Sequence, residues 1–441
     1  MSRPKAFPFQ KKTVYRIEEF GGRALLGHEM GLGKTLCSLW FMKRQRLDTL
    51  PALVVCPASV KWNWVHEAET HVGLRTLVLE GQKPSKRLKL GNVKVVIINY
   101  DILKHWLPVL EKLKFKTIVF DECHYLQNRR TQRTKAATRI ATGIPHCLAL
   151  SGTPLTNRPS ELFTSLHILV PEEFPAYWTF AQNYCAPKMT RWGWDYSGAS
   201  NLEDLHQRLK KTCLIRYLKQ DVLHELPDKV RNVVPLELSN PKEYVKARDN
   251  FIVWLRENAP DKVTSASRAI QLARIGYLLR LAAKLKLRGV VEWANRFLEE
   301  TDEKLILFAV HKKCIAALSR RVNAKHVIID GSVKSKDRQA SVQQFQQDDK
   351  TRLFIGNIRA AGVGINLNAA STLGFAELWW KPGDHLQAED RPHRIGQKNT
   401  VFINYFVGHE TIEEVLCEIL QRKQQIIREA LDGKGLGDLS V

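Results

Sequence analysis

Short apolar runs recur along this chain, and longer segments that are compatible with helices lie between most of them. Each run is continuous rather than alternating, and each is bounded by glycine, proline or charged residues. The runs lie at 24–26, 53–55, 95–98, 117–120 and 147–150, and again at 305–308, 327–329, 353–355 and 401–403. Continuous runs are typical of strands covered on both faces, as in a parallel sheet with crossover helices. The sequence therefore predicts an α/β fold.

The runs form two groups, separated by a mostly helical region rich in arginine and lysine at about 160–289. The chain shows no internal repeat and no low-complexity tract. Its 441 residues are too many for one compact core and suit two or three domains. We expect a first α/β lobe at 1–165, a basic helical insertion and linker region at 166–289, and a second α/β lobe at 290–441.

The chain is strongly basic, with 68 lysines and arginines against 45 aspartates and glutamates, a net charge of +23 and a pI near 9.7. Such an excess repels itself unless a polyanion is present, and a nucleic-acid backbone is the usual polyanion because neutralised phosphates release counterions. A basic surface that only aids solubility is the simpler alternative. An anionic membrane surface is the competing partner, but no juxtamembrane cluster of lysine and arginine and no long basic amphipathic helix stands out. Charge therefore favours nucleic acid over a membrane.

Other classes of protein and site find little support in the sequence. No stretch approaches the roughly 18 apolar residues of a membrane span, and the first residues lack the apolar core of a secretory signal. The eight cysteines are scattered singly without a C-x-x-C pair, which disfavours a zinc ribbon and indicates a reducing, intracellular compartment. His66 and His71 are five positions apart, so on an α-helix they point to different faces and we do not expect them to share a metal.

A glycine-rich segment, Gly-Leu-Gly-Lys-Thr at 31–35, follows the first apolar run and precedes a helix-compatible segment. Backbone N–H groups of such a loop form an anion-binding concavity, and the helix N-terminus adds its dipole. Lys34 would reach the β- and γ-phosphates, and the Thr35 hydroxyl would complete a Mg²⁺ shell. The strict G-x-x-x-x-G-K-T pattern fails, because His28 stands where the first glycine is expected. A glycine-rich turn that happens to precede a lysine is the alternative.

Two adjacent carboxylates, Asp121 and Glu122, follow the apolar run at 117–120. Ligands of α/β sheets bind at the carboxyl ends of the strands, so these side chains are well placed to serve a nucleotide. Asp121 would hold Mg²⁺ directly or through water, and Glu122 would polarise the attacking water. A solvated strand end would explain the same pair taken alone, but not its occurrence together with the Lys34 loop.

A pair of arginines near the C-terminus completes the requirements of phosphoryl transfer, since charge on the transferring group must be stabilised. Arg391 and Arg394 are three positions apart, so on a helical turn they face the same way. A charged, solvated helix end that stops at a glycine is the alternative that composition leaves open.

With these residues in place, the chain resembles the Swi/Snf-type ATPases of the second helicase superfamily over nearly its whole length. The matching segments occur in the family's order. They are Phe7 to Gln10 (the adenine-reading segment), Glu29 to Thr35 (the nucleotide loop), Pro57 to Glu67 (motif Ia), Asp121 to His124 (a variant D-E-A-H box), Leu150 to Pro154 (the coupling motif), Asn357 to Leu367 (motif V) and Gln387 to Gln397 (motif VI). An ordered series of this length does not arise by chance.

The resemblance implies two RecA-like parallel-sheet lobes with helical insertions between them, and ATP with Mg²⁺ in the cleft. It assigns nucleotide binding to Gln10, Gly31, Gly33, Lys34, Thr35, Gly364 and Gln387, magnesium to Thr35 and Asp121, catalysis to Lys34, Asp121, Glu122, Arg391 and Arg394, and coupling to His124, Ser151 and Thr153. Ser59, Lys61 and Arg359 are candidate nucleic-acid contacts, for which a generic basic surface is nearly as good an explanation.

The middle of the chain resembles the annealing-helicase, fork-remodelling branch of that family. The matching segments are Tyr184-Cys185 followed by Trp192 to Gly198, Leu214 to Lys219, Leu226 to Lys229, and Ala376 to Asp384. The aromatic residues from Trp192 to Tyr196 could stack on unpaired bases. A small aromatic core within the helical insertion would explain them equally well.

Family members track duplex DNA, usually without unwinding it, by a hinge cycle in which ATP binding closes the cleft. The resemblance therefore implies an ATP-dependent translocase that moves along double-stranded or branched DNA and remodels DNA structures or protein–DNA complexes. We expect a monomeric motor with no membrane partner and with protein partners that the sequence does not reveal. A strand-separating DNA or RNA helicase is the first alternative. A non-catalytic nucleic-acid clamp is the second, and the complete set of charged residues at the nucleotide site disfavours it.

Overall fold

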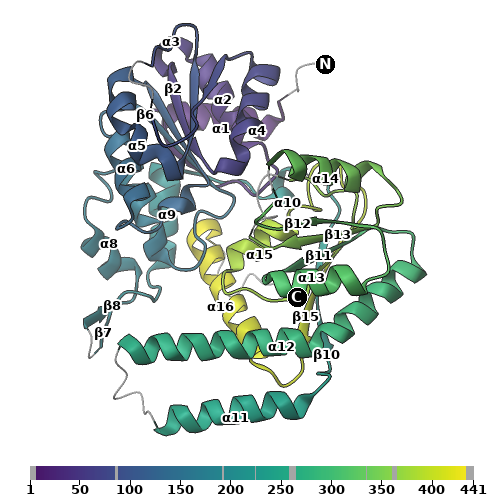
Figure 1. Cartoon of the computed structure of the whole chain (residues 1–441). Helices are drawn as coiled ribbons and strands as arrows, with labels where there is room; N and C mark the ends of the chain where they lie inside the picture. Colours follow the sequence, from purple (N-terminus) through teal and green to yellow (C-terminus); the bar gives the residue numbers. More distant parts are fainter. Residues whose placement is uncertain are drawn as a thin grey trace. The chain divides into compact units, whose positions relative to one another are not determined.

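The computed structural model describes residues 6–84, 88–190, 193–223, 225–257, 265–333, 335–359 and 365–433. The chain divides into two compact units. Unit 1 comprises Met1–His224 and Lys423–Val441, and unit 2 comprises Glu225–Arg422. Each unit is built on its own parallel sheet with helices packed against it (Figure 1). The predicted α/β fold with two parallel-sheet lobes is therefore confirmed.

Unit 1 contains a seven-stranded sheet in the order β3-β4-β2-β5-β6-β1-β9, and every neighbouring pair of strands is parallel. The strands are β1 (Arg23–Leu26), β2 (Ala52–Cys56), β3 (Thr76–Val78), β4 (Val95–Asn99), β5 (Thr117–Asp121), β6 (His146–Leu150) and β9 (Leu214–Ile215). The continuous apolar runs form β2 and β4, which are buried at every position. Both faces of these strands are thus covered, as the runs predicted.

The helices of unit 1 follow the strands in the alternation that a parallel sheet requires. They are α1 (Pro8–Glu19), α2 (Lys34–Arg44), α3 (Arg46–Thr49), α4 (Lys61–His66), α5 (Tyr100–Leu110), α6 (Gln132–Ala141), α7 (Phe163–Leu169), α8 (Tyr177–Tyr184), α9 (Leu202–Thr212) and α10 (Lys219–Val222), with short 3₁₀ turns at Ala58–Val60, Glu111–Leu113, Cys123–Leu126 and Pro159–Glu161 and a π-helix at Glu67–Val72. Buried side chains of α5, α6 and α7 share one apolar core with alternate residues of β2, β4, β5 and β6.

Unit 1 includes parts of the chain that the sequence analysis placed elsewhere. Strand β9 pairs with β1, and α9 contributes Leu205 and Leu209 to the core of unit 1. The end of α16 (Ile412–Asp432) adds Ala430 and Leu431 to the same core. Its last residue, Asp432, forms an ion pair with Arg216 just after β9. The expected boundaries at 165 and 290 therefore differ from the observed division, because strand pairing and packing recruit segments that are distant in sequence.

Unit 2 contains a six-stranded parallel sheet in the order β10-β15-β14-β11-β13-β12. The strands are β10 (Lys229–Leu236), β11 (Leu305–Ala309), β12 (His326–Ile329), β13 (Leu353–Asn357), β14 (Thr372–Phe375) and β15 (Val401–Gly408), and the helices are α11 (Pro241–Glu257), α12 (Ser265–Glu300), α13 (Lys312–Arg321), α14 (Ser335–Gln347) and α15 (Pro382–Glu389), with α16 beginning here. Strand β10 lies in the region expected to be an insertion, yet it pairs along its whole length with β15.

Unit 1 also contains a two-stranded antiparallel hairpin that is not part of its seven-stranded sheet. It consists of β7 (Lys188–Thr190) and β8 (Gly193–Asp195), with Met189 opposite Trp194.

All eight cysteines are free, and seven of them are buried. Within the described ranges, no helix is both long enough and apolar enough to cross a membrane.

Candidate nucleotide site

The glycine-rich loop lies between β1 and α2, as its sequence context predicted. Gly31 and Gly33 adopt φ values of 84° and 74°, in the left-handed region that favours glycine. A Cβ on Gly33 would lie 2.5 Å from Nε2 of Gln10, so a side chain here would be strained by the backbone conformation and would displace the Gln10 amide. Helix α2 begins at Lys34, directly after this glycine, and its first turn contains Thr35. The loop thus has the geometry of a phosphate cradle at a helix N-terminus.

Lys34 and Gln10 are both held against this loop. The Lys34 ammonium donates to the carbonyl oxygens of His28 at 2.9 Å and Glu29 at 3.2 Å. Gln10 is 4% exposed, and its Nε2 donates to the carbonyl oxygen of Leu32 at 3.2 Å. Helix α1 and the loop therefore lie together, so a residue predicted to read adenine adjoins the residues predicted to bind phosphate.

His28 replaces the expected first glycine and is completely buried. Its Nδ1 accepts a hydrogen bond from the backbone N–H of Tyr217 at 3.2 Å, so its other nitrogen carries the proton. That Nε2 donates to Oγ1 of Thr13 at 3.0 Å, and Thr13 in turn donates to the carbonyl oxygen of Phe9. Burial lowers the pKa of His28 to about 3, and the Lys34 ammonium adds to the effect. A neutral imidazole thus links α1, the loop and the segment after β9.

Asp121 ends β5 with both carboxylate oxygens engaged. Oδ2 accepts from the indole Nε1 of Trp64 at 2.8 Å, and Oδ1 accepts from the backbone N–H of Glu122 at 3.0 Å. The Tyr100 hydroxyl donates to the Asp121 carbonyl oxygen at 2.8 Å. Burial and then the Glu122 carboxylate raise the pKa of Asp121 to about 6, against the opposing effects of Trp64 and Lys34. A nearby cation would favour the ionised carboxylate.

Glu122 occupies a strained position that aims its carboxylate at the coupling residues. Its φ is 52°, which is uncommon for any residue other than glycine and occurs often at functional sites. Oε2 accepts from the Ser151 hydroxyl at 3.2 Å and lies 3.3 Å from Nδ1 of His124. The same His124 nitrogen lies 3.3 Å from the Ser151 oxygen. The D-E-C-H box and the coupling motif therefore meet at the Glu122 carboxylate.

The coupling motif also contacts the phosphate loop. The backbone N–H of Thr153 donates to the Ser151 oxygen at 3.1 Å, which orders the turn after β6. A Cβ on Gly152 would lie 2.3 Å from Cγ of Met30, so the two segments approach too closely for a side chain. Sequence reasoning did not foresee the contacts of Trp64, Tyr100 or Met30. The available signal was that buried Trp and Tyr side chains usually find a hydrogen-bond acceptor.

Unit 2 brings the two predicted arginines together, although not on a helix. Helix α15 ends at Glu389, and both later arginines donate from NH1 to the carbonyl oxygen of Ile365, Arg391 at 3.2 Å and Arg394 at 3.4 Å. The premise of a helical turn was wrong, because the chain from 390 to 397 folds as successive turns. Arg391 is 7% exposed, so this segment is not a solvated helix end either.

Buried ion pairs anchor this segment to the sheet of unit 2. Glu389 accepts hydrogen bonds from Nε and NH2 of Arg231 and from the Tyr405 hydroxyl, and its Oε2 lies 3.2 Å from Nζ of Lys229. Burial opposes ionisation, but Lys229 and Arg231 lower the pKa of Glu389 to about 2. The Leu226-to-Lys229 segment singled out in the sequence thus leads into a strand that fixes motif VI. Gln387 is also buried, at 7% exposure.

The candidate nucleic-acid contacts differ in how exposed they are. Ser59 and Arg359 are exposed. Lys61 is 7% exposed, and its ammonium donates to the carbonyl oxygen of Leu79 at 3.2 Å. The structure therefore contradicts the prediction that Lys61 contacts the nucleic-acid backbone. A buried lysine with this partner does not present its charge to a phosphate. Gly364, predicted to bind nucleotide, lies outside the described residues.

The prediction that His66 and His71 point to different helix faces is wrong. The rings of His66 and His71 lie 5.5 Å apart between centroids, so they share a face rather than pointing apart. The reason is the π-helix at Glu67–Val72, in which residues five apart are close neighbours. The described part of the chain nonetheless contains no group of three metal-ligating side chains around them or elsewhere.

Two parallel-sheet units, the first with a glycine-rich loop before a helix and an acidic strand end, have the architecture of a two-lobed, helicase-type core. A family model described as the SNF2-related domain matches residues 14–275, which is more than half of the chain. A second, described as the helicase conserved C-terminal domain, matches residues 288–396. The chain belongs to the SNF2-related family, as the sequence motifs predicted.

Named relatives agree with the predicted branch. The chain is 36% identical to the SWI/SNF-related matrix-associated actin-dependent regulator of chromatin subfamily A-like protein 1 homolog of Caenorhabditis elegans, covering 96% of this chain and 61% of that protein. It is 33% identical to the human DNA annealing helicase and endonuclease ZRANB3, covering 98% of this chain and 41% of that protein. The Sulfolobus solfataricus SWI2/SNF2 ATPase core solved with dsDNA is 23% identical, covers 98% of this chain and 94% of that structure, and has a TM-score of 0.47. The chain spans only about two fifths to three fifths of these two full-length relatives.

Proposed function

We propose that this chain is an ATP-dependent DNA translocase, which hydrolyses ATP with Mg²⁺ to move along double-stranded or branched DNA and remodel DNA structures or protein–DNA complexes. The observation that carries the proposal is the meeting of three motifs in unit 1. The Ser151 hydroxyl of the coupling motif donates to the Glu122 carboxylate, and Lys34 is among the charges that act on Asp121. One compact unit therefore joins phosphate binding, water activation and coupling.

Each residue at the nucleotide site has a defined task in this proposal. Gln10 orients the adenine, and the backbone N–H groups of the loop and the Lys34 ammonium hold the phosphates. Thr35 and Asp121 offer hard oxygen ligands of the kind that Mg²⁺ prefers, and the ion would neutralise charge on the β- and γ-phosphates. Glu122 accepts hydrogen bonds at its carboxylate and orients the attacking water.

Ser151 and His124 are the proposed sensors of this step. Both contact the Glu122 carboxylate, so any change in the charge or position of that carboxylate alters their hydrogen bonds. Thr153 is fixed to Ser151 through its backbone N–H, which carries the change into the chain after β6. We propose that Arg391 and Arg394 stabilise charge on the transferring phosphoryl group.

The choice of DNA rests on charge and on similarity. A net charge of +23 favours a polyanion, and one relative is named a DNA annealing helicase and endonuclease. Exposed Ser59 and Arg359 remain the proposed contacts with the DNA backbone. The eight free cysteines support a reducing, intracellular compartment.

The steady-state ATPase rate in the presence of duplex DNA, forked DNA, single-stranded DNA and RNA tests this proposal. We expect duplex or forked DNA to stimulate turnover, and Glu122→Gln to abolish the stimulation while DNA binding persists. Stimulation only by single strands or RNA, together with release of a labelled strand from a duplex with an overhang, would establish the strand-separating helicase instead. Binding of DNA without any ATP hydrolysis would establish the clamp.

A further inference from the structure

A groove in unit 1 lies outside the nucleotide site and combines aromatic and cationic side chains. Its cavity of about 610 Å³ is within the range of sites that hold small ligands. It lies between the turns around Arg129 and Arg158, helix α8 and the β7–β8 hairpin, and we call it the aromatic groove. Its lining includes Arg129, Arg130, Arg158, Tyr177, Trp178, Trp194 and Tyr196.

The aromatic residues of the groove form an inner and an outer layer. Tyr177 and Tyr196 are partly buried and pack against the core of unit 1. Trp178 and Trp194 are 54% and 58% exposed. Tyr196 contacts both indoles, with ring centroids 5.4 Å from Trp178 and 6.4 Å from Trp194. Of the aromatic residues from Trp192 to Tyr196 considered in the sequence analysis, Tyr196 packs against the core, Trp194 presents its surface to solvent as Trp178 does, and Trp192 lies outside the described residues.

Positive charge surrounds these rings. The Arg129 guanidinium lies 3.9 Å from the Tyr177 ring centroid and 5.3 Å from that of Trp178. Arg129, Arg130 and Arg158 are exposed, and none forms an ion pair with a carboxylate in the part of the chain that the structure describes. The one acidic lining residue, Glu161, accepts hydrogen bonds from the Thr156 hydroxyl at 2.6 Å and from two backbone N–H groups. The groove therefore offers unneutralised positive charge to a ligand.

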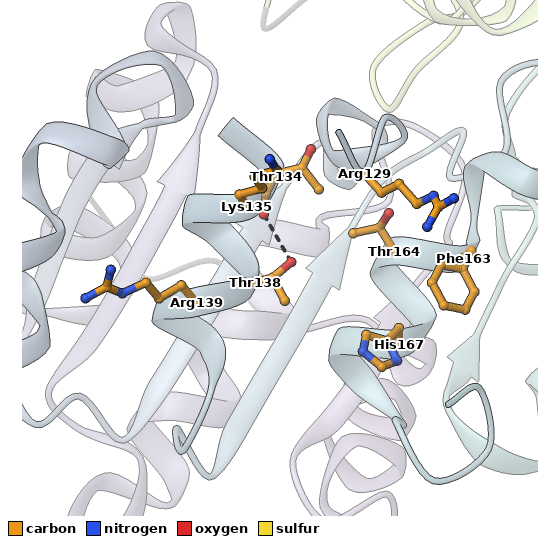
Figure 2. Close-up of a pocket in the computed structure, with 8 residues that line it drawn as sticks. All are labelled: Arg129, Thr134, Lys135, Thr138, Arg139, Phe163, Thr164 and His167. Carbon is orange, nitrogen blue, oxygen red and sulfur yellow. Dashed lines mark hydrogen bonds between the residues drawn. The ribbon is translucent and has the colours of Figure 1, made fainter. Parts of the chain in front are cut away.

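A second hollow adjoins the aromatic groove at Arg129. Its cavity of about 370 Å³ lies between α6 and α7, and it shares Arg129 and Thr164 with the lining of the aromatic groove. Figure 2 shows Lys135, Thr138 and Arg139 of α6 on one side and Phe163, Thr164 and His167 of α7 on the other. The hollow is therefore polar, with Arg129 and Lys135 among its basic groups, whereas the Arg139 guanidinium is paired with Glu111.

We propose that the aromatic groove binds unpaired nucleotides, whose bases stack on Trp178 and Trp194 while Arg130 and Arg158 contact the neighbouring phosphates. Base stacking on aromatic side chains within a basic groove is the usual mode of binding single strands without reading their sequence. Bases within an intact duplex stack on one another, so their faces are not accessible to the indoles. The proposal rests on the proposed function and deepens it, because a groove of this chemistry would select the single-stranded arm of a fork.

Fluorescence anisotropy with labelled DNA, without nucleotide, tests the proposal. The substrates are a blunt duplex, a fork with single-stranded arms, and the same fork with abasic arms. We expect Trp178→Ala with Trp194→Ala to weaken binding to the fork at least about thirtyfold and to leave the blunt duplex unchanged. Abasic arms should weaken wild-type binding to the same extent and should not weaken the double variant further.

Three further variants test the contribution of stacking, test the contribution of charge and provide a matched control. Replacing both tryptophans by phenylalanine should restore most of the affinity for the fork, because phenylalanine retains an aromatic face. Arg130→Ala with Arg158→Ala should reduce the slope of log affinity against log salt by about two. Tyr277→Ala, which removes an aromatic residue of 52% exposure in unit 2, is the matched control and should change nothing.

The outcomes are decisive in either direction. Equal affinity of wild type and the double tryptophan variant for the fork would overturn the proposal, as would an equal loss on fork and duplex. A cooperative thermal unfolding transition like that of wild type is the criterion that the double variant is folded. If no DNA stimulates wild-type ATPase, the proposed translocase fails, whereas the anisotropy comparison still decides whether the groove binds unpaired nucleotides.

Discussion

His28 stands at a position where the common phosphate-loop pattern has glycine, and its environment explains why this chain retains an imidazole there. The ring is completely buried and uses both nitrogens, one toward Tyr217 and one toward Thr13. A glycine at this position would leave a cavity and remove both hydrogen bonds. The loop of this protein is therefore stabilised by its neighbours in a way that the consensus pattern does not describe.

We expect His28→Ala to impair both nucleotide binding and stability. The substitution leaves a buried donor and acceptor without their partner, which costs about 1–3 kcal/mol for each such group. Loss of the link to α1 should also raise KM for ATP, because Gln10 of that helix adjoins the loop. Thermal unfolding and steady-state kinetics check this expectation. A variant with unchanged KM and unchanged unfolding temperature would show that the hydrogen bonds of His28 are dispensable.

Arg391 and Arg394 share an acceptor but differ in burial, which separates their expected phenotypes. Arg394 is partly exposed, so Arg394→Ala should lower kcat far more than ATP affinity and leave thermal stability nearly unchanged. Arg391 is 7% exposed, so Arg391→Ala should lower both kcat and stability. Single-turnover kinetics and thermal unfolding of the two variants check the difference. An undiminished kcat in Arg394→Ala would remove that residue from catalysis.

Glu389 should make the stability of unit 2 depend on pH. The groups facing its carboxylate are Lys229, Arg231, Tyr405 and His385. Its pKa of about 2 in the folded protein lies below its ordinary value of 4.5, so the ion pairs stabilise the fold fully above about pH 4.5. This contribution is lost as the pH falls toward 2. Glu389→Gln should cost about 1–3 kcal/mol at neutral pH, because it removes the charged acceptor of Arg231 and Tyr405, whereas Lys229 keeps Asp390 as a partner.

Denaturant unfolding of wild type and Glu389→Gln between neutral and acidic pH measures that contribution. The difference between the two proteins should shrink as the pH falls below about 4.5, since protonation removes the wild-type advantage. A difference that stays constant with pH would mean that the carboxylate acts through packing rather than charge.

At the scale of elements, one buried ion pair ties helices to the sheet of unit 2. Lys286 of α12 is fully buried, and its ammonium lies 2.7 Å from Oε2 of Glu413 at the start of α16. The same ammonium donates to the carbonyl oxygen of Phe406 in β15 at 2.5 Å. No local pattern in the sequence indicates this pair, because the two residues are separated by more than a hundred positions.

Lys286→Met should therefore destabilise unit 2 by about 3–5 kcal/mol, because it leaves the Glu413 carboxylate buried without a counter-charge. Lys286→Met combined with Glu413→Leu should recover part of that loss, since no buried charge then remains. A double-mutant cycle measured by denaturant unfolding gives the coupling energy. Purely additive losses would mean that the two side chains contribute independently.

At the scale of the whole molecule, the net charge of +23 governs the response to salt. Duplex affinity should fall about a thousandfold or more between roughly 50 and 200 mM salt if at least about six phosphates are contacted. Sequence preference should be weak, because contacts to the backbone carry no sequence information. Anisotropy titrations with two unrelated duplexes at several salt concentrations check both expectations. A shallow salt slope with strong sequence preference would indicate base recognition instead.

Local patterns were sufficient to predict most of the first sheet and the places of several candidate ligand-binding residues on it. The apolar runs at 53–55 and 95–98 became fully buried parallel strands, and Lys34 and Asp121 occupy the ends of elements where the sequence placed them. Continuous burial leaves a local trace because every position of such a strand must be apolar. The boundaries between units have no comparable signal in the local sequence. The segments that form strands β9 and β10 were therefore predicted to belong to a separate insertion.

The sequence by itself determined the fold class and the order of motifs, because both follow from local composition and spacing, and it supplied the candidate residues of the nucleotide site. Only the tertiary structure decided that Lys61 is buried, that Trp64 donates to Asp121 and that Glu122 meets Ser151. It alone separated the tyrosines that complete the core from the tryptophans that face solvent. Burial and pairing depend on contacts between distant segments, and only a folded chain brings those segments together.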